Sequence, residues 1–121
     1  MISVSWNVRG LGNPHNFRAL KKFLQEKDPD LVFLMETKKS KIEMADICFN
    51  IGFGGCCVVE KMGRSSGGLA MCWKKDMEVR TVGFSTGHID VEVRLEAGLI
   101  RVTGFYGNLD TNNRGASWEL L

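Results

Sequence analysis

Five consecutive apolar residues, Leu31–Met35 (LVFLM), constrain the fold of this chain more than any other feature of its sequence. Pro29 and Asp30 precede the run, and Glu36 follows it. A strand with one face in water alternates apolar and polar residues, whereas a strand covered on both faces carries a continuous apolar run. The run therefore predicts a buried strand with other elements packed on both of its sides.

The residues before this strand predict another strand and a helix. Ile2–Asn7 contain β-branched residues and a tryptophan, which favours a strand. Helical spacing begins at His15 and continues to Lys27, and Asn13 can cap this helix ahead of Pro14. Its apolar positions are Phe17, Leu20, Phe23 and Leu24. A strand–helix–strand order favours a parallel strand pair joined by a right-handed crossover.

The rest of the chain predicts one more helix and then short strands, so the expected class is mixed α/β (α+β). Ser40 can cap a helix that ends near Gly52 and carries Ile42, Ala45, Asp46 and Phe49. Five strand-like segments follow: Phe53–Glu60, Gly68–Lys74, Glu78–Phe84, His88–Leu95 and Leu99–Gly107. In the fourth of these, apolar and polar residues alternate, so one face is expected to be buried and one solvated. Arg114–Leu121 resemble the start of a helix.

Charge and hydropathy narrow the class of protein. The net charge is +2, with eight basic and seven acidic residues in each of 1–60 and 61–121. A domain that holds nucleic acid by electrostatics alone is usually far more basic, so the pairs Lys21-Lys22, Lys38-Lys39 and Lys74-Lys75 are expected to be solvated. No apolar run reaches the roughly 20 residues that span a bilayer, and the N-terminus lacks the features of a signal peptide. A soluble, intracellular protein is expected.

The cysteines show no metal-binding pattern. They lack CxxC spacing, and His15 and His88 do not complete a zinc site. The four are Cys48, Cys56, Cys57 and Cys72. We expect buried, reduced thiols, because a free cysteine behaves as a small apolar residue. The two adjacent cysteines fall in an expected strand, so their side chains should point to opposite faces.

Three polar residues lie at the ends of expected strands and are candidate site residues. Asn7 ends the first strand, Glu36 follows the buried strand, and Tyr106 lies at the end of the last. Ligands collect at the carboxyl ends of strands in α/β sheets. Each residue also has a plain structural explanation: a turn for the Asn, a strand meeting water for the Glu, and a core-edge aromatic for the Tyr. The glycine-rich segment Gly63–Trp73 does not match a nucleotide P-loop.

In combination, several short motifs resemble those of the endonuclease/exonuclease/phosphatase superfamily. They are SWNVRGLGNP (5–14), VFLMETK (32–38), GRSSGGLAMCW (63–73), HID (88–90), TGFYG (103–107) and SWELL (117–121). The chain is most similar to the N-terminal endonuclease domain of plant LINE-type (non-LTR) retrotransposon polyproteins, over nearly its whole length. The doublet Ser65-Ser66 lengthens the usual RSGG turn by one residue.

The resemblance implies a phosphodiesterase site that uses Mg²⁺ or Mn²⁺ and acts on the DNA phosphate backbone. Glu36 matches a metal ligand of the family, and a carboxylate suits a hard cation. Asn7 lies beside it, within the metal and phosphate site. Tyr106 matches a tyrosine whose hydroxyl is directed at the scissile phosphate. Arg9 could contact phosphate, whereas Asp90, in the HID run, has no assigned role.

The resemblance also implies that residues 1–121 form one partial domain. The family continues with an Asp-x-Asn motif of the form GDxN, which orients the attacking water, and ends with an Asp-His pair; neither GDxN nor an Asp-His pair occurs in this sequence. Family members are two-sheet, four-layer sandwiches with helices outside. The expected fold is therefore half of such a sandwich, a mixed sheet with helices on one face. Its uncovered apolar sheet face could mediate self-association.

Three functional hypotheses follow. The first is a fragment of a Mg²⁺-dependent DNA endonuclease that is inactive by itself, because metal-assisted hydrolysis also needs a positioned nucleophile; its parent reaction indicates work in the nucleus. The second is a non-catalytic folded remnant or interaction module. The third is a phosphatase of the same superfamily, which the GLGNP and SWELL runs disfavour.

Overall fold

Leu31–Met35 form strand β2 at the centre of the molecule, and all five of its residues are buried. Val32 and Leu34 face a core shared with the helices, whereas Phe33 and its neighbours on the other face contact a second sheet. The predicted covering of both faces is confirmed. The structure, a computed structural model, describes residues 1–60, 67–106 and 118–120.

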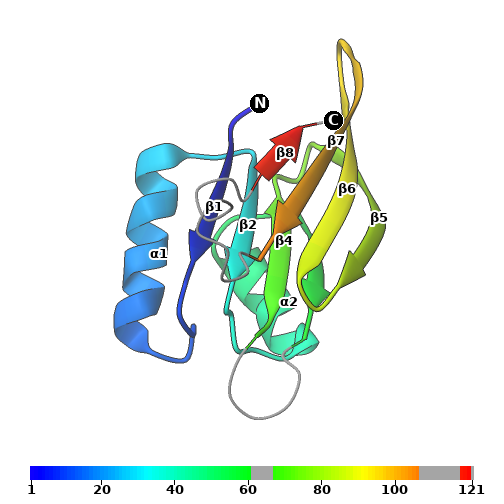
Figure 1. Ribbon diagram of the computed structural model, residues 1–121. Coiled ribbons are helices and arrows are strands. Elements are labelled where there is room, and N and C mark those ends of the chain that lie inside the picture. Colours follow the sequence, from blue (N-terminus) through cyan, green and yellow to red (C-terminus); the bar gives the residue numbers. More distant parts are fainter. Residues whose placement is uncertain (61–66, 107–117, 121) are drawn as a thin grey trace.

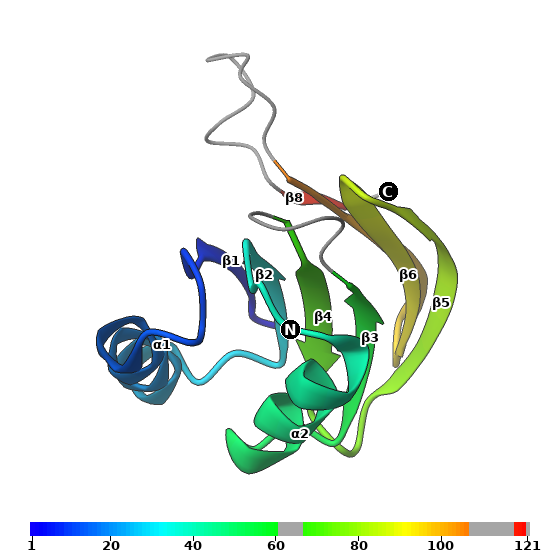
Figure 2. The same cartoon turned by 90° about the horizontal axis from the view of Figure 1, so that it is seen from below.

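Strand β2 belongs to a four-stranded mixed sheet with the order β1-β2-β4-β3; Figure 1 labels β1, β2 and β4, and Figure 2 also labels β3. Its other strands are β1 (Ser3–Asn7), β4 (Leu69–Trp73) and β3 (Gly55–Val59). β1 pairs with β2 in parallel, and β4 is antiparallel to both β2 and β3. Asn7 lies opposite Met35, which lies opposite Leu69, so the ends of β1 and β2 meet the start of β4 at one edge.

Two helices cover the outer face of this sheet (Figure 2). They are α1 (Pro14–Lys27) and α2 (Lys41–Asn50). Both predicted caps are confirmed: the Asn13 side chain accepts from the His15 N–H, and Ser40 forms a reciprocal capping box with Glu43. In the described ranges no helix is long and apolar enough to cross a membrane.

The second sheet has the order β5-β6-β7-β8, and all its neighbouring strands are antiparallel. Its strands are β5 (Glu78–Ser85), β6 (His88–Leu95), β7 (Gly98–Phe105) and β8 (Trp118–Leu120). The predicted alternation in β6 is confirmed, since Ile89, Val91 and Val93 are fully buried. These side chains pack against the inner face of the first sheet. The described residues thus form both sheets, and each inner face is covered by the other sheet.

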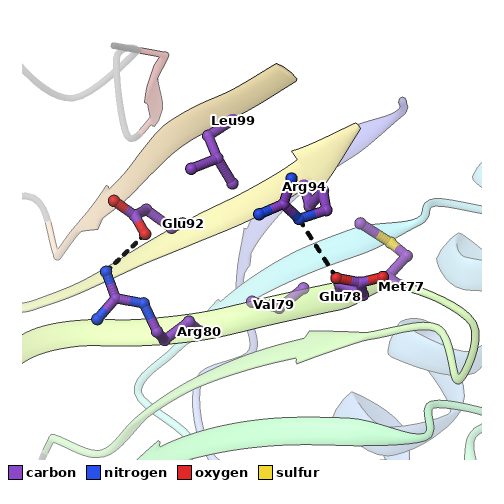
Figure 3. Close-up of a pocket in the computed structure, with 7 residues that line it drawn as sticks. All are labelled: Met77, Glu78, Val79, Arg80, Glu92, Arg94 and Leu99. Atoms are coloured by element: carbon purple, nitrogen blue, oxygen red, sulfur yellow. Dashed lines mark hydrogen bonds and ion pairs between the residues drawn. The ribbon is translucent and has the colours of Figure 1, made fainter. Parts of the chain in front are cut away.

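The two sheets cover each other's inner apolar faces, which corrects the expectation of an uncovered apolar sheet face, and the outer face of the second sheet carries ion pairs beside the exposed Leu99 and Phe105. Three ion pairs cross it: Arg80–Glu92, Arg94–Glu78 and Arg101–Asp90. Figure 3 shows the first two beside an open depression of about 430 Å³ that Leu99 also lines. None of the predicted site residues lines this depression. The difference arises because the second sheet supplies its own apolar face to the first and turns its ion pairs to water.

Helix α2 buries a different face from the one its apolar residues indicated. Ile42 and Phe49 are 84% and 75% exposed, and Met44 and Cys48 are buried instead. The buried side is the one that packs against the first sheet, where α2 contacts β3 and is joined to β4 through Cys48 and Cys72. Position relative to the sheet, and not the helix's own apolar stripe, therefore decides which side chains are covered.

The C-terminal prediction is wrong for residues 118–120, which form strand β8 and not a helix. β8 pairs with β7 from Val102–Leu120 to Gly104–Trp118. The ladder with β7 supplies backbone partners from a distant segment, which outweigh the local helical pattern. The rest of the expected helix, 114–117 and 121, lies outside the described residues.

The expectation of four reduced thiols is corrected for two cysteines. Cys48 of α2 and Cys72 of β4 are paired as a disulfide, with 6.5 Å between their Cα atoms. The packing of α2 on the first sheet brings them together from 24 residues apart. Cys56 and Cys57 are free, and they contact the helix-side core and the inter-sheet core respectively. Their predicted opposite orientation is confirmed.

Candidate active site

The carboxylate of Glu36 lies where β2 ends and receives two hydrogen bonds on one oxygen. Asn7 Nδ2 donates to Glu36 Oε2 at 2.8 Å, and Tyr106 Oη donates to the same oxygen at 2.5 Å. The other oxygen, Oε1, accepts no hydrogen bond from the described residues. The three candidate residues predicted from strand ends therefore meet at one carboxylate oxygen.

Strand topology explains how these residues meet. The parallel pairing of β1 with β2 places Asn7 beside Met35, so the residues that follow lie at one edge. Tyr106 comes from the other sheet, directly after β7, and its N–H donates to Gly87 O at 2.8 Å. The site thus lies where strands of both sheets end.

Backbone hydrogen bonds hold the loop after β1 against the loop after β2. Gly10 N donates to Glu36 O at 2.7 Å, and Leu11 N donates to Thr37 O at 3.1 Å. Asn7 Oδ1 accepts from Arg9 N at 3.0 Å. Because its oxygen is engaged in this way, the Asn7 amide presents its NH₂ group to the carboxylate. The side-chain orientation follows from the turn.

Backbone strain is concentrated at this edge. Arg9, Glu36 and Lys38 have φ values of 54°, 56° and 55°, in the left-handed region that non-glycine residues seldom adopt. Asp28, the C-cap of α1, is the one other non-glycine residue of this kind among the described residues. Such strain persists where surrounding contacts enforce it, and it clusters at functional sites.

The hydrogen bonds shift the pKa values of Glu36 and Tyr106 in opposite directions. The bonds from Tyr106 and Asn7 lower the pKa of Glu36, more than its partial burial raises that pKa. The positive charges of Lys38 and Arg9 act in the same direction. The bond to the carboxylate, with burial and the negative charge, raises the pKa of Tyr106. At neutral pH the site therefore holds a carboxylate and a protonated phenol.

Comparison with known proteins identifies the family and the fold of the chain. The model of the Endonuclease/Exonuclease/phosphatase family matches residues 4–120. The chain belongs to this family. Its fold class, mixed α/β with two sheets and few helices, matches the DNase-like fold of its structural neighbours. No curated protein matches the chain.

Two solved structures resemble this member of the endonuclease/exonuclease/phosphatase family. The endonuclease domain of TRAS1, a telomere-specific non-LTR retrotransposon, has a TM-score of 0.58 and 12% identity. The match covers 93% of this chain and 48% of that one. Humanized D. rerio TDP2 with 14 mutations has a TM-score of 0.57 and 18% identity, over 91% of this chain and 52% of that one. At these identities the likeness shows a shared fold, and the chain spans about half of each structure.

One cation near the candidate site, Lys38, was not predicted from the sequence to lie there. Lys38 was expected to be a solvated residue of a lysine pair, and it is exposed, but its side chain lies over Gly10. A Cβ atom on that glycine would be 3.2 Å from Lys38 Cδ. With Arg9, which lines an open groove of about 520 Å³ along β1, Lys38 places positive charge beside Glu36. The signal was present in the ETKK run, which directly follows the buried strand.

Asp90, which had no assigned role, does not lie in this cluster. It accepts two hydrogen bonds from Arg101 Nε, one from the terminal nitrogen of Arg101 and one from Thr103 Oγ1. These bonds lower the pKa of Asp90. Its role in this structure is to pair β6 with β7 on the outer face of the second sheet. Ser65-Ser66 lie outside the described residues.

Proposed function

We propose that Asn7, Glu36 and Tyr106 are part of the active site of a divalent-metal-dependent DNA endonuclease of the retrotransposon type. The observation that carries the proposal is the convergence of Asn7 Nδ2 and Tyr106 Oη on Glu36 Oε2. Arg9, Glu36 and Lys38, in the loops after β1 and β2, adopt strained left-handed conformations at this edge. The family match supports phosphoester chemistry at this site.

Glu36 has the chemistry that Mg²⁺ or Mn²⁺ needs in a ligand. Its lowered pKa keeps it ionised, and Oε1 accepts no hydrogen bond from the described residues. Hard divalent cations prefer such carboxylate oxygens. When bound, the cation would stabilise charge that develops on a phosphate oxygen. We assign Asn7 to the same site, where its NH₂ group holds the carboxylate in place.

Tyr106 and the nearby cations are suited to contact the phosphate. The raised pKa of Tyr106 keeps its hydroxyl protonated, so it can donate to an oxygen on which charge develops. Arg9 can approach a phosphodiester through its guanidinium group, which binds phosphate by paired hydrogen bonds. Lys38 adds a second positive charge at the same edge. A DNA substrate would place the reaction in the nucleus.

We further propose that the 121 residues cleave DNA very slowly by themselves. Within 1–60, 67–106 and 118–120, no three His, Cys, Asp or Glu side chains gather to hold a metal ion. Hydrolysis needs a positioned nucleophile as well as a Lewis acid. Catalytic groups act as a unit, so a partial set does not keep a proportional share of the rate.

The test combines Mn²⁺ binding by calorimetry with nicking of supercoiled plasmid in Mg²⁺ or Mn²⁺. Glu36→Gln removes the carboxylate charge, and Asp90→Asn is the matched control, another carboxylate whose pKa is lowered by side-chain hydrogen bonds. We expect Glu36→Gln to weaken Mn²⁺ binding by about tenfold or more, and Asp90→Asn to leave it unchanged. Nicking should be slight in every sample.

Other outcomes would overturn either the proposed metal site or the proposed slow cleavage. If Glu36→Gln leaves the affinity for Mn²⁺ unchanged, that result would contradict the proposed metal site and favour a non-catalytic folded module. Robust nicking that Glu36→Gln abolishes would establish the endonuclease and contradict its proposed inactivity. Hydrolysis of a phosphate monoester in place of DNA would indicate a phosphatase, which the family description also includes.

A further inference from the structure

The residues that lead into β4 lie directly against the residue pair that follows Glu36. Thr37 N donates to Gly68 O at 3.1 Å, and Lys38 N donates to Gly67 O at 3.0 Å. The contact between β2 and β4 therefore continues past the end of β2. On their other side, Glu36 O and Thr37 O accept from the loop after β1. The carboxylate-bearing turn is held from both sides by backbone.

This contact leaves no room for a side chain at position 68. A Cβ atom on Gly68 would lie 2.4 Å from Thr37 Oγ1 and 3.0 Å from Lys38 N. Real Cβ atoms do not approach other heavy atoms this closely, so the turn would have to move. The φ of Gly68 is +94°, which L side chains also disfavour.

Thr37 has little freedom to move away from position 68. The residue is fully buried, so neighbouring atoms enclose its side chain. Its neighbour Glu36 already has a left-handed φ of 56°. A displacement of Thr37 would be transmitted through one peptide bond to Glu36, and so to the carboxylate that Asn7 and Tyr106 contact.

We propose that Gly68 is a positioning residue: its lack of a side chain lets the start of β4 close on Thr37 and fixes the Glu36 carboxylate beneath Asn7 and Tyr106. The role of that carboxylate rests on the proposed function. The positioning itself rests on the close approach of Gly68 to Thr37, which involves no metal ion.

Two other glycines allow the clash of a side chain at position 68 with Thr37 to be distinguished from backbone strain. Gly52 and Gly98 have φ values of +103° and +134°, and a Cβ atom on either would meet nothing within 4 Å. Gly52→Ala therefore imposes the left-handed strain without the clash. It is the matched control for Gly68→Ala, because both substitutions add one methyl group to a residue with nearly the same φ.

The experiment uses the whole chain and two readouts. The first is the affinity for Mn²⁺, measured by calorimetry. Gly68→Ala should lower this affinity by about 10- to 100-fold, the loss typical when a group that orients a metal ligand is changed. The second is the NMR signal of the Asn7 side-chain NH₂ group, measured with a chelator present. Gly68→Ala should shift it toward the signal in Glu36→Gln, whereas Gly52→Ala should leave both readouts unchanged.

Removal of the closest atom should restore the site in part. Thr37→Ala eliminates Oγ1, so the double variant Gly68→Ala/Thr37→Ala should recover Mn²⁺ affinity and the Asn7 signal relative to Gly68→Ala. If Gly68→Ala does not fold, the double variant is compared with Thr37→Ala alone. The double variant should then bind Mn²⁺ more weakly than Thr37→Ala does, because a Cβ atom at position 68 would still lie 3.0 Å from Lys38 N.

Several results would overturn the proposal. Equal losses in Gly68→Ala and Gly52→Ala would assign the effect to backbone strain alone. An unchanged Asn7 signal in Gly68→Ala would show that the carboxylate is not displaced. Where Gly68→Ala does not fold, equal Mn²⁺ affinity of Thr37→Ala and the double variant would do the same. If Glu36→Gln leaves Mn²⁺ binding unchanged, the proposed function fails, while the Asn7 signal still tests the positioning.

Discussion

Tyr106 donates a hydrogen bond to Glu36 Oε2 at 2.5 Å, across 70 residues of sequence. The bond joins the end of a strand in one sheet to the end of a strand in the other. A hydrogen bond to a charged partner is stronger than one between neutral groups. This pair therefore reports directly on whether the two sheets are correctly docked at the candidate site.

Tyr106 is the single tyrosine of the chain, so its ionisation can be followed by phenolate absorbance. Glu36 raises the pKa of Tyr106 above its ordinary value of 10.0. On the alkaline side, the contribution of this pair to stability is retained up to pH 10.0 and is lost as the pH rises through the raised pKa. We expect Glu36→Gln to lower the titration midpoint toward 10.0. An unchanged midpoint would contradict the hydrogen bond.

The carboxylate side of the pair predicts the acid dependence of stability. The pKa of Glu36 is lowered from 4.5, so its stabilising contribution is present above pH 4.5 and is lost as the pH falls through the lowered pKa. The free energies of unfolding of the wild type and of Glu36→Gln should therefore converge as the pH falls below 4.5. Urea unfolding at a series of pH values measures this, and a constant difference would argue against it.

Thr37 and Thr103, the buried threonines among the described residues, should respond in opposite ways to loss of their hydroxyl groups. Thr37 Oγ1 has no partner among the described residues, whereas Thr103 Oγ1 donates to Asp90 at 2.9 Å. Thr37→Val should raise the free energy of unfolding by about 1 kcal/mol, because it removes an unsatisfied buried polar group. Thr103→Val should lower it by about 1 kcal/mol. Chemical denaturation of both variants checks the sign, and a loss in Thr37→Val would point to a partner for that hydroxyl.

The spacing of the sheets should make Gly104 intolerant of a methyl group. A Cβ atom there would lie 2.6 Å from the ring of Phe33, in the core between the sheets. Gly104→Ala should lower the free energy of unfolding by about 1–3 kcal/mol through overpacking. Gly83 in β5 is the control, since a Cβ atom there meets nothing within 4 Å and its φ is unexceptional. Equal stability of the two variants would contradict the close approach.

The cysteine pairing predicts a thiol count. With Cys48 and Cys72 joined, the unfolded, unreduced chain should react with a thiol reagent at two sites, Cys56 and Cys57. After reduction it should react at four sites, the full cysteine content. Mass spectrometry of the labelled peptides identifies the sites, and four reactive thiols before reduction would show that the pair is not oxidised.

Local signals predicted much of the site. Asn13 and Ser40 cap helices where their side chains could reach the first turn, because capping depends on residues within a few positions. Asn7, Glu36 and Tyr106 were placed at strand ends by the polarity that follows each apolar run, and the structure brings these ends together. Their assignment to a metal and phosphate site stays a prediction.

Other features depended on contacts that no local pattern contains. Ile42 and Phe49 form an apolar stripe that faces water, since the side of α2 that meets the sheet carries Met44 and Cys48. Trp118–Leu120 form a strand because β7 offers backbone partners. The closeness of Gly68 to Thr37 follows from the pairing of β2 with β4.

The sequence by itself determined the buried strand Leu31–Met35, the capped helices and the set of polar residues at strand ends, because each depends on the order of neighbouring side chains. Tertiary structure alone decided that Glu36 receives hydrogen bonds from Asn7 and Tyr106 on the same oxygen. That geometry depends on how two sheets meet, and the energy of their packing comes from residues distant in the chain.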